Sequence, residues 1–192
     1  FEKIRNSADA NKEYERMTSG GRQALSNFPK PLIARIRGFC MGGGLAIAMR
    51  ADMRYSAEDG SFGIPAARLS IAYAFDQVGM LVDLVGPAHA AMILYTGRRI
   101  DARYAERIGL INECVPVDKL DETVLSVART IAVNAPLSIA ASKMSIQACL
   151  KDPADRDMER IRRQGQICAD SEDFREGRRA FMEKRSPVFT GR

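Results

Sequence analysis

Three consecutive glycines, Gly42 to Gly44, are the residues of this 192-residue sequence with the clearest potential for chemistry. They follow an alternating stretch that predicts a strand, and they run directly into an apolar stretch that predicts a short helix at about 43–51. A strand, a glycine turn and a helix N-terminus direct backbone N–H groups and the positive end of the helix dipole to one place. Such a turn can bind an anion or stabilise an oxygen that gains charge in a transition state. Close packing of the helix on the strand would also select glycine, so the triplet alone leaves both interpretations open.

Two other kinds of site are not favoured by the sequence. The glycine order is neither G-x-G-x-x-G nor G-x-x-x-x-G-K-[ST], so a nucleotide phosphate is not specifically indicated. The four cysteines are scattered without a C-x-x-C pair, and His89 is the only histidine, so no metal site is expected. Scattered cysteines without a paired motif are usually reduced and mostly buried thiols, and we therefore expect a cytoplasmic protein.

The charge and hydropathy of the chain restrict its partners. The net charge is +5, the pI is about 9.2, and basic residues crowd the C-terminal third. This suits an anionic partner such as a phosphate-bearing ligand, although the interleaved acidic residues are typical of a solvated helix face. No aromatic-rich RNA motif is present, so nucleic acid is not favoured. No uninterrupted apolar run approaches the ~18–20 residues of a membrane-spanning helix, and no membrane partner is expected.

The first part of the chain predicts a mixture of helices and strands. A polar helix is expected over 1–27, followed by a strand at 32–37 with Ile36 on the buried face and Arg35 and Arg37 on the other. A strand, a turn at 58–60 and a short extended piece come next. Gly86 and the proline after it should stop a helix over about 78–85, with a second helix at 88–95. Asp101 should cap a helix that ends near residue 109, before a short strand.

The second part predicts helices only, at about 120–131, 136–151, 154–168 and 171–183. Pro136 and Pro153 mark breaks between them. The sequence therefore predicts an α/β portion over 1–116 and a helical portion over 117–192.

Four segments resemble the crotonase, or enoyl-CoA hydratase/isomerase, superfamily, in order and over nearly the whole chain. The first is KPLIARIRGFCMGGGLAIAMRADMRYSAEDGSFGIP, and LVGPAHAAMILYTGRRIDARYAERIGLINECVP follows it. The others are NAPLSIAASKMSI and EGRRAFMEKRSPVFTGR. The resemblance implies a spiral of ββα units with a helical C-terminal portion that builds trimers and often hexamers. The first strands of the family would precede Phe1.

The resemblance also implies an activity. Crotonase-like proteins bind acyl-CoA thioesters and stabilise an enolate at the thioester oxygen with two backbone N–H groups. The position of the first donor here is Gly43, and the second would come from a loop before Phe1. No cofactor is implied beyond the coenzyme A of the substrate. Gly42, Ala46, Ala66 and Tyr73 are then expected to line the substrate site.

The sequence departs from the family at both catalytic glutamates of the hydratases. Ala46 occupies the first position and Ala66, in FGIPAARL, the second. Adding water to a conjugated double bond needs a base to activate the water and an acid to protonate carbon, and a methyl group supplies neither. Each such group is typically worth ~10²–10⁴ in rate, so we expect a very poor hydratase.

Other polar residues near the expected site are candidate substitutes. Asp76 is a tentative catalytic replacement, with capping of the helix that begins just after it as the alternative. Tyr73 could be a pocket wall, and Arg68 could face the site or form a salt bridge. Glu58 and Asp59 are expected in a surface turn.

Phe181 and Lys184 are three residues apart and are expected on one helix face. The resemblance suggests that this pair contacts the nucleotide portion of coenzyme A from a neighbouring subunit. A lysine at a helix end is also favoured simply by the dipole. Two functions stay open: an acyl-CoA enzyme of the family, and a catalytically weak acyl-CoA-binding or assembly protein with the same fold.

Overall fold

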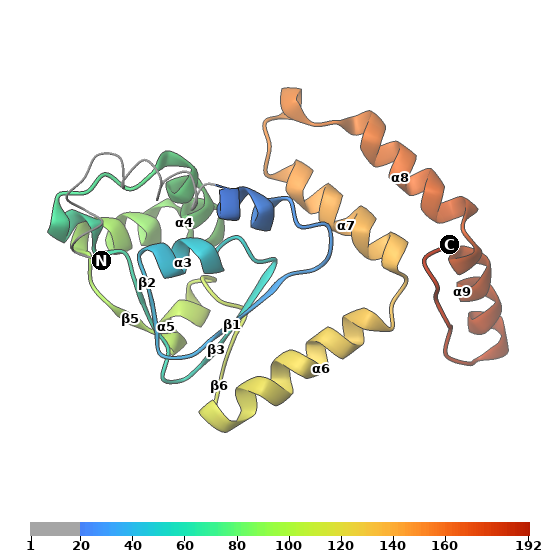
Figure 1. Ribbon diagram of the computed structural model, residues 1–192, viewed down its shortest axis with the longest axis horizontal. Coiled ribbons are helices and arrows are strands. Elements are labelled where there is room, and N and C mark those ends of the chain that lie inside the picture. The colour runs from blue at the N-terminus through green and yellow to red at the C-terminus, as the bar shows by residue number, and fades with distance from the viewer. Residues whose placement is uncertain (1–19) are drawn as a thin grey trace. The chain divides into compact units, whose positions relative to one another are not determined.

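The computed structural model describes residues 20–192, which form two compact units (Figure 1). The first, the α/β unit, contains Leu32–Leu120, and the second, the helical unit, contains Asp121–Arg192 together with Pro29–Pro31. Residues 20–26 are helical, and the rest of the helix predicted over 1–27 lies outside the described residues.

The α/β unit is built on two three-stranded sheets. In the first sheet β3 (Met53–Ala57) lies between β1 (Ile33–Ile36) and β6 (Glu113–Val115), and all three strands are parallel. In the second sheet β2 (Phe39–Met41) pairs in parallel with β4 (Ser61–Gly63), and the short β5 (Ile100–Asp101) pairs antiparallel to β4.

The chain passes from the first sheet to the second at two glycine-containing turns. Gly38, with a φ of 66°, separates β1 from β2, and Gly60 separates β3 from β4. A Cβ at Gly60 would lie 2.2 Å from Oγ of Ser56, so only glycine fits there. Asp59 joins the two turns, because its carboxylate accepts the N–H of Gly38 at 3.2 Å. The predicted turn at 58–60 is confirmed, and it connects strands of different sheets.

The local patterns of the α/β unit are largely as predicted. Ile36 is buried while Arg35 and Arg37 are exposed, as the alternation indicates. The break predicted at Gly86 is present, because two helical segments, together labelled α4 (Phe75–Thr96), meet at a kink where Gly86 has a non-helical φ of 73° and ψ of 164°. Asp101 caps α5 (Ala102–Arg107), with its carboxylate accepting the N–H of Tyr104 at 2.7 Å. Two shorter helices are α3 (Gly43–Ala48) and the 3-10 helix η1 (Pro65–Leu69).

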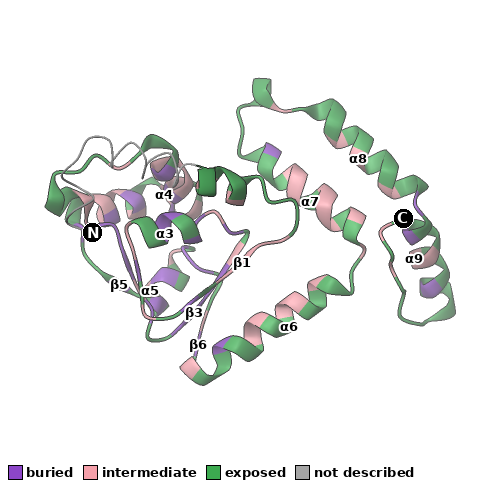
Figure 2. Cartoon of the chain, in the orientation of Figure 1, coloured by how far each residue is buried: buried purple, intermediate pink, exposed green. Residues whose placement is uncertain are grey.

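The core of this unit lies between its sheets and helices (Figure 2). Its largest fully buried side chains come from α3, from β4 and the residue after it, from α4 and from the segment before β6. They include Leu45, Phe62, Ile64, Leu81, Ile93 and Leu110.

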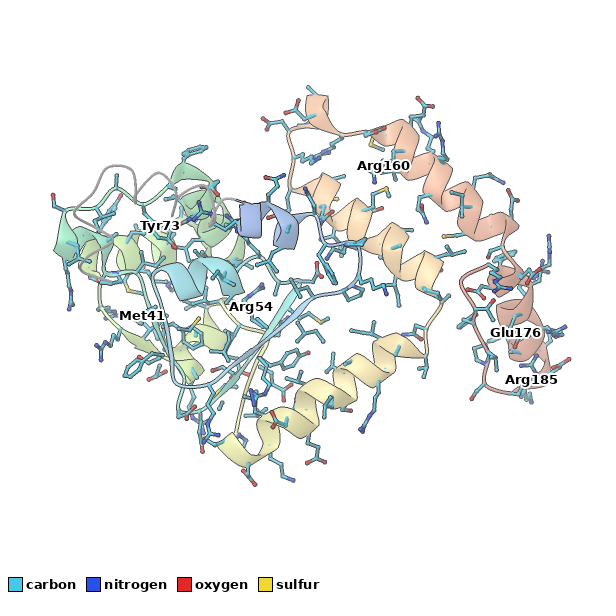
Figure 3. The ribbon with its side chains drawn as sticks, viewed as in Figure 1. Met41, Arg54, Tyr73, Arg160, Glu176 and Arg185 are labelled. Carbon is cyan, nitrogen blue, oxygen red and sulfur yellow. The ribbon has the colours of Figure 1, made fainter. Side chains whose placement is uncertain are left out.

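Arg54 is a buried charge inside this unit (Figure 3). Its Nε donates to the carbonyl of Leu110 at 2.9 Å and its Nη1 to the carbonyl of Ala51 at 2.6 Å. Burial lowers the pKa of Arg54. The guanidinium thus ties the segment before β6 to the end of the α3 region, which is a structural role.

By length and composition α4 could cross a membrane. However, it is broken at Gly86, which Pro87 follows, and it sends Leu81, Val85 and Ile93 into the core of the α/β unit. We therefore interpret α4 as a core helix.

The helical unit contains α6 (Leu120–Ala132) from its second residue on, α7 (Pro136–Cys149), α8 (Met158–Asp170) and α9 (Glu172–Glu183), with the 3-10 helix η3 (Pro153–Asp155) before α8. The 3-10 helix η2 (Val117–Lys119), just before α6, belongs to the α/β unit. The breaks predicted at Pro136 and Pro153 are confirmed. Helix α8 begins later than predicted, because Asp157 caps it by accepting the N–H of Arg160 at 2.9 Å.

The C-terminal tail, residues 186–192, returns along α9. The buried Asp173 accepts the N–H groups of Thr190 and Gly191 at 2.7 and 2.8 Å. Glu176 accepts the N–H of Val188 at 3.1 Å. Two carboxylates of one helix thus hold the tail.

Candidate functional site

The glycine turn has the backbone geometry of a donor site. Gly42 has a φ of 50° and a ψ of −111°, a conformation that L-residues rarely adopt. Its N–H donates to the carbonyl of Gly63 at 2.8 Å, and its carbonyl accepts the N–H of Ala46 at 3.0 Å. Gly43 is the first residue of α3, so its N–H has no acceptor within the helix. The N–H at the predicted position therefore needs an acceptor from outside α3.

Packing does not explain the glycine triplet. A Cβ built on Gly42, Gly43 or Gly44 would meet no heavy atom of the described residues within 4 Å. By contrast, a Cβ on Gly63 would lie 2.8 Å from the carbonyl oxygen of Arg98. Gly42 is required by its positive φ, and the space beside the other two is open. Contacts among residues 20–192 therefore do not support the close-packing interpretation of the triplet.

The two alanines differ in their surroundings. Ala46 lies on the buried side of α3 with 2% of its surface exposed, and Ala66 is half-buried in η1. Neither position offers a proton-transfer group.

Tyr73 lies in the loop between η1 and α4 and is half-buried (Figure 3). Its hydroxyl is 3.4 Å from the carbonyl oxygen of Gly42, a long and weak hydrogen bond. The pKa of Tyr73 is raised to about 12, mainly by burial; Arg50 lowers it, and Asp76 and Cys40 raise it by smaller amounts. The hydroxyl is therefore a proton-bearing donor next to the glycine turn.

Asp76 does not cap α4. The capping position is Ala74, and Asp76 instead accepts a hydrogen bond from Nη2 of Arg50 at 3.0 Å. The physical reason is burial, because the Arg50 side chain is only 7% exposed and a buried guanidinium needs a counter-charge. The Asp76 side chain is 62% exposed. The capping alternative is thus wrong.

Arg50 is the polar residue near the turn that sequence reasoning missed. Its Nη1 contacts the sulfur of Met80 at 3.2 Å, and its Nε is buried without a hydrogen-bond partner among residues 20–192. The only signal in the sequence is a single charge inside the otherwise apolar run AIAMRA.

The remaining polar candidates of the α/β unit lie elsewhere. Arg68 reaches the end of α4, where its Nη2 donates to the carbonyl of Thr96 at 3.5 Å. Glu58 pairs with Arg103 at 3.7 Å, and Asp59 belongs to the turn described above, so both are at the surface as expected.

Phe181 and Lys184 do not share a helix face, because α9 ends at Glu183. Lys184 adopts a left-handed conformation with a φ of 53°, and its N–H and that of Arg185 close the helix end on the carbonyls of Phe181 and Ala180. Phe181 is 82% exposed and borders a cavity of about 630 Å³ in the helical unit. The expected pairing on one face is therefore wrong.

Several basic residues of the helical unit are neutralised by acids. Arg185 donates to both carboxylate oxygens of Glu176, at 2.6 and 3.0 Å, and to Glu183 at 2.6 Å (Figure 3). Arg179 pairs with Glu176 as well, and Arg163 pairs with a glutamate one turn before it. The hydrogen bonds from Arg185 are the main reason that the pKa of Glu176 lies well below its ordinary value. This pattern favours a solvated helix face.

No three His, Cys, Asp or Glu side chains within residues 20–192 come together as a metal site would require. The four cysteines, all in this range, are free thiols.

Known proteins resemble the chain in sequence and in fold. The profile of a family described as enoyl-CoA hydratase/isomerase matches residues 2–192. Carnitinyl-CoA dehydratase of Salmonella typhi is 36% identical over 176 residues, which cover 90% of this chain and 67% of that protein. The crystal structure of an enoyl-CoA hydratase/carnithine racemase from Magnetospirillum magneticum matches all of the chain and 71% of its own, with a TM-score of 0.90 and 35% identity. Enoyl-CoA hydratase from Bacillus anthracis matches 97% of this chain and 72% of its own, with a TM-score of 0.90 and 29% identity.

Proposed function

Because the chain belongs to the enoyl-CoA hydratase/isomerase family, we propose that it binds acyl-CoA thioesters and stabilises a thioester enolate with the N–H of Gly43. The predicted crotonase-like α/β fold with a helical C-terminal portion is confirmed by the solved structures that it matches. The activity of this chain is our proposal.

The glycine turn is the observation that carries the proposal. When a proton leaves the α-carbon of a thioester, negative charge develops on the thioester oxygen. A backbone N–H that already points into open space stabilises this charge without reorganising. Gly43, the first residue of α3, provides an N–H without an acceptor in its own helix, and the open space beside Gly43 would admit the thioester.

The proton-transfer chemistry differs from that of a two-glutamate hydratase. With alanine at positions 46 and 66, hydration of an enoyl-CoA lacks both an acid and a base, and we expect it to be slow. Asp76 is the carboxylate that we propose as the remaining acid–base group. One such group, together with the N–H of Gly43, suits reactions that need less proton transfer, such as decarboxylation or hydrolysis of a thioester.

The coenzyme A portion would be recognised in part by the helical unit. We propose that Phe181 offers a flat apolar surface to the adenine and that Lys184 offers charge to the phosphates, from a neighbouring subunit of a homotrimer or hexamer. The large exposed fraction of Phe181 supports this role. The free cysteines support the cytoplasm as the compartment.

A second candidate is a catalytically weak acyl-CoA-binding or assembly protein, which the alanines at 46 and 66 favour. One experiment separates the two. The protein is incubated with a panel of acyl-, 3-hydroxyacyl- and enoyl-CoA thioesters, the products are weighed by mass spectrometry, and binding is measured by calorimetry. Turnover of any thioester, with a product mass that gives the reaction class, supports the enzyme. Binding without turnover across the panel supports the binder, and absence of binding contradicts both.

A further inference from the structure

Tyr73 lies against the same peptide group that supplies the proposed enolate-stabilising N–H. We propose that Tyr73 is a positioning residue, whose hydroxyl orients and polarises the Gly42–Gly43 peptide. This inference rests on the proposed function of Gly43 and adds a specific side chain to it.

The geometry of one peptide unit connects the two groups. The carbonyl of Gly42 and the N–H of Gly43 belong to the same planar, trans peptide, so they point in opposite directions. The Tyr73 hydroxyl contacts this carbonyl at 3.4 Å. It therefore approaches the peptide from the side opposite to the ligand. Tyr73 is thus placed to act on the N–H of Gly43 through the peptide.

A donor on a carbonyl strengthens the N–H of the same peptide, because hydrogen bonds in a chain polarise one another. The carbonyl of Gly42 accepts two donors, the N–H of Ala46 at 3.0 Å and the hydroxyl of Tyr73. The N–H of Gly42 is fixed separately on the carbonyl of Gly63 at 2.8 Å. These bonds hold the turn on both sides of Gly42. The Tyr73 bond is the one among them that a single side-chain change can remove.

The surroundings keep Tyr73 in place and protonated. Asp76 follows Tyr73 by three residues, and its ion pair with Arg50 fixes the start of α4 against the segment just after α3. The loop that carries Tyr73 is therefore anchored beside the turn. Burial gives the phenol a pKa of about 12, so it remains a donor at neutral pH.

The test combines Tyr73→Phe with Gly43→Pro in the whole protein. Proline removes the N–H of Gly43 at the first helical position, where proline is well tolerated. The assay is exchange of the α-proton of butyryl-CoA in deuterated water, followed by mass spectrometry. We expect Tyr73→Phe to lower the maximal exchange rate about three- to tenfold with little change in KM, as loss of one modest hydrogen bond would. In the Gly43→Pro background the same change should have no further effect.

A second readout does not depend on turnover. In the ¹H–¹⁵N spectrum the Gly43 amide should shift in Tyr73→Phe, while the amide of Gly79 in α4, a matched glycine, stays in place. The inference would be overturned if Tyr73→Phe lowered the exchange rate in the Gly43→Pro background as much as it does in the wild type. An unmoved Gly43 amide would overturn it as well. An unchanged exchange rate in Gly43→Pro itself would instead overturn the proposed function, and the inference with it.

Discussion

The ion pair between Asp76 and Arg50 gives a way to separate chemistry from folding at the candidate site. Replacing Asp76 by alanine removes both a proposed acid–base group and the counter-charge of a guanidinium that is 7% exposed. Replacing it by asparagine removes the acid–base group and keeps an oxygen that can accept the hydrogen bond of Arg50. The two variants should therefore differ in stability and agree in activity.

The stability cost follows from the exposure of the two partners. Breaking a fully buried pair costs about 3–5 kcal/mol, and breaking an exposed pair costs about 0–1 kcal/mol. Here the arginine is buried and the Asp76 side chain is 62% exposed, so we expect about 1–3 kcal/mol for Asp76→Ala. At roughly 2–4 °C per kcal/mol, this lowers the Tm by about 2–12 °C. Asp76→Asn should lose less than half of that amount.

Activity is measured on whichever thioester of the panel is turned over. If Asp76 transfers the proton, both variants lose about 10²-fold or more in kcat while Asp76→Asn remains folded by circular dichroism. An Asp76→Asn variant with wild-type kcat would refute the acid–base role and leave Asp76 with the structural role alone. Efficient hydration of crotonyl-CoA that both variants abolish would refute the slow-hydratase expectation.

Two other predictions concern ionisable groups outside the turn. The pKa of Glu176 lies below its ordinary value of 4.5, so its bonds stabilise the protein above that pH, and this stabilisation is lost as the pH falls below it. In urea titrations Glu176→Gln should therefore be less stable than the wild type at pH 7. The difference in the free energy of unfolding should shrink from about pH 5 to pH 3, and a constant difference would contradict the role of the Glu176 charge. Burial raises the pKa of the Cys40 thiol to about 11, while Cys149 is exposed. At pH 8 iodoacetamide should thus modify Cys149 at least about tenfold faster by peptide mass spectrometry, and equal rates would show that Cys40 is accessible.

Local patterns in the sequence predict the features that depend on neighbouring residues. The alternation around Ile36, the cap at Asp101 and the break at Gly86 each depend on a few adjacent positions, and all three are present. The family resemblance predicts Gly43 as the donor position, and the structure adds that Gly43 begins α3 after a residue with positive φ and has open space beside it.

Features that depend on distant residues could not be predicted in this way. Arg50 and Asp76 are 26 positions apart and meet only because α3 and α4 fold together. A cap was the natural local expectation for Asp76, and burial of a distant charge overrides it. Lys184 lies in the left-handed cap that ends α9, and the tail beyond it is held on α9 by Asp173, through contacts at Thr190 and Gly191 that no helical periodicity describes.

Enolate stabilisation by the Gly43 N–H is tested most directly by α-proton exchange in three proteins, the wild type, Gly43→Pro and Gly44→Ala. A Cβ at either glycine meets no described heavy atom within 4 Å, so both variants should fold, and only the first loses the donor. Binding of butyryl-CoA is measured for both variants. We expect exchange in Gly43→Pro to fall about 10²–10³-fold, the usual cost of one such donor, and exchange in Gly44→Ala to stay near the wild-type rate. Wild-type exchange in a folded, ligand-binding Gly43→Pro variant would contradict the role assigned to the glycine turn.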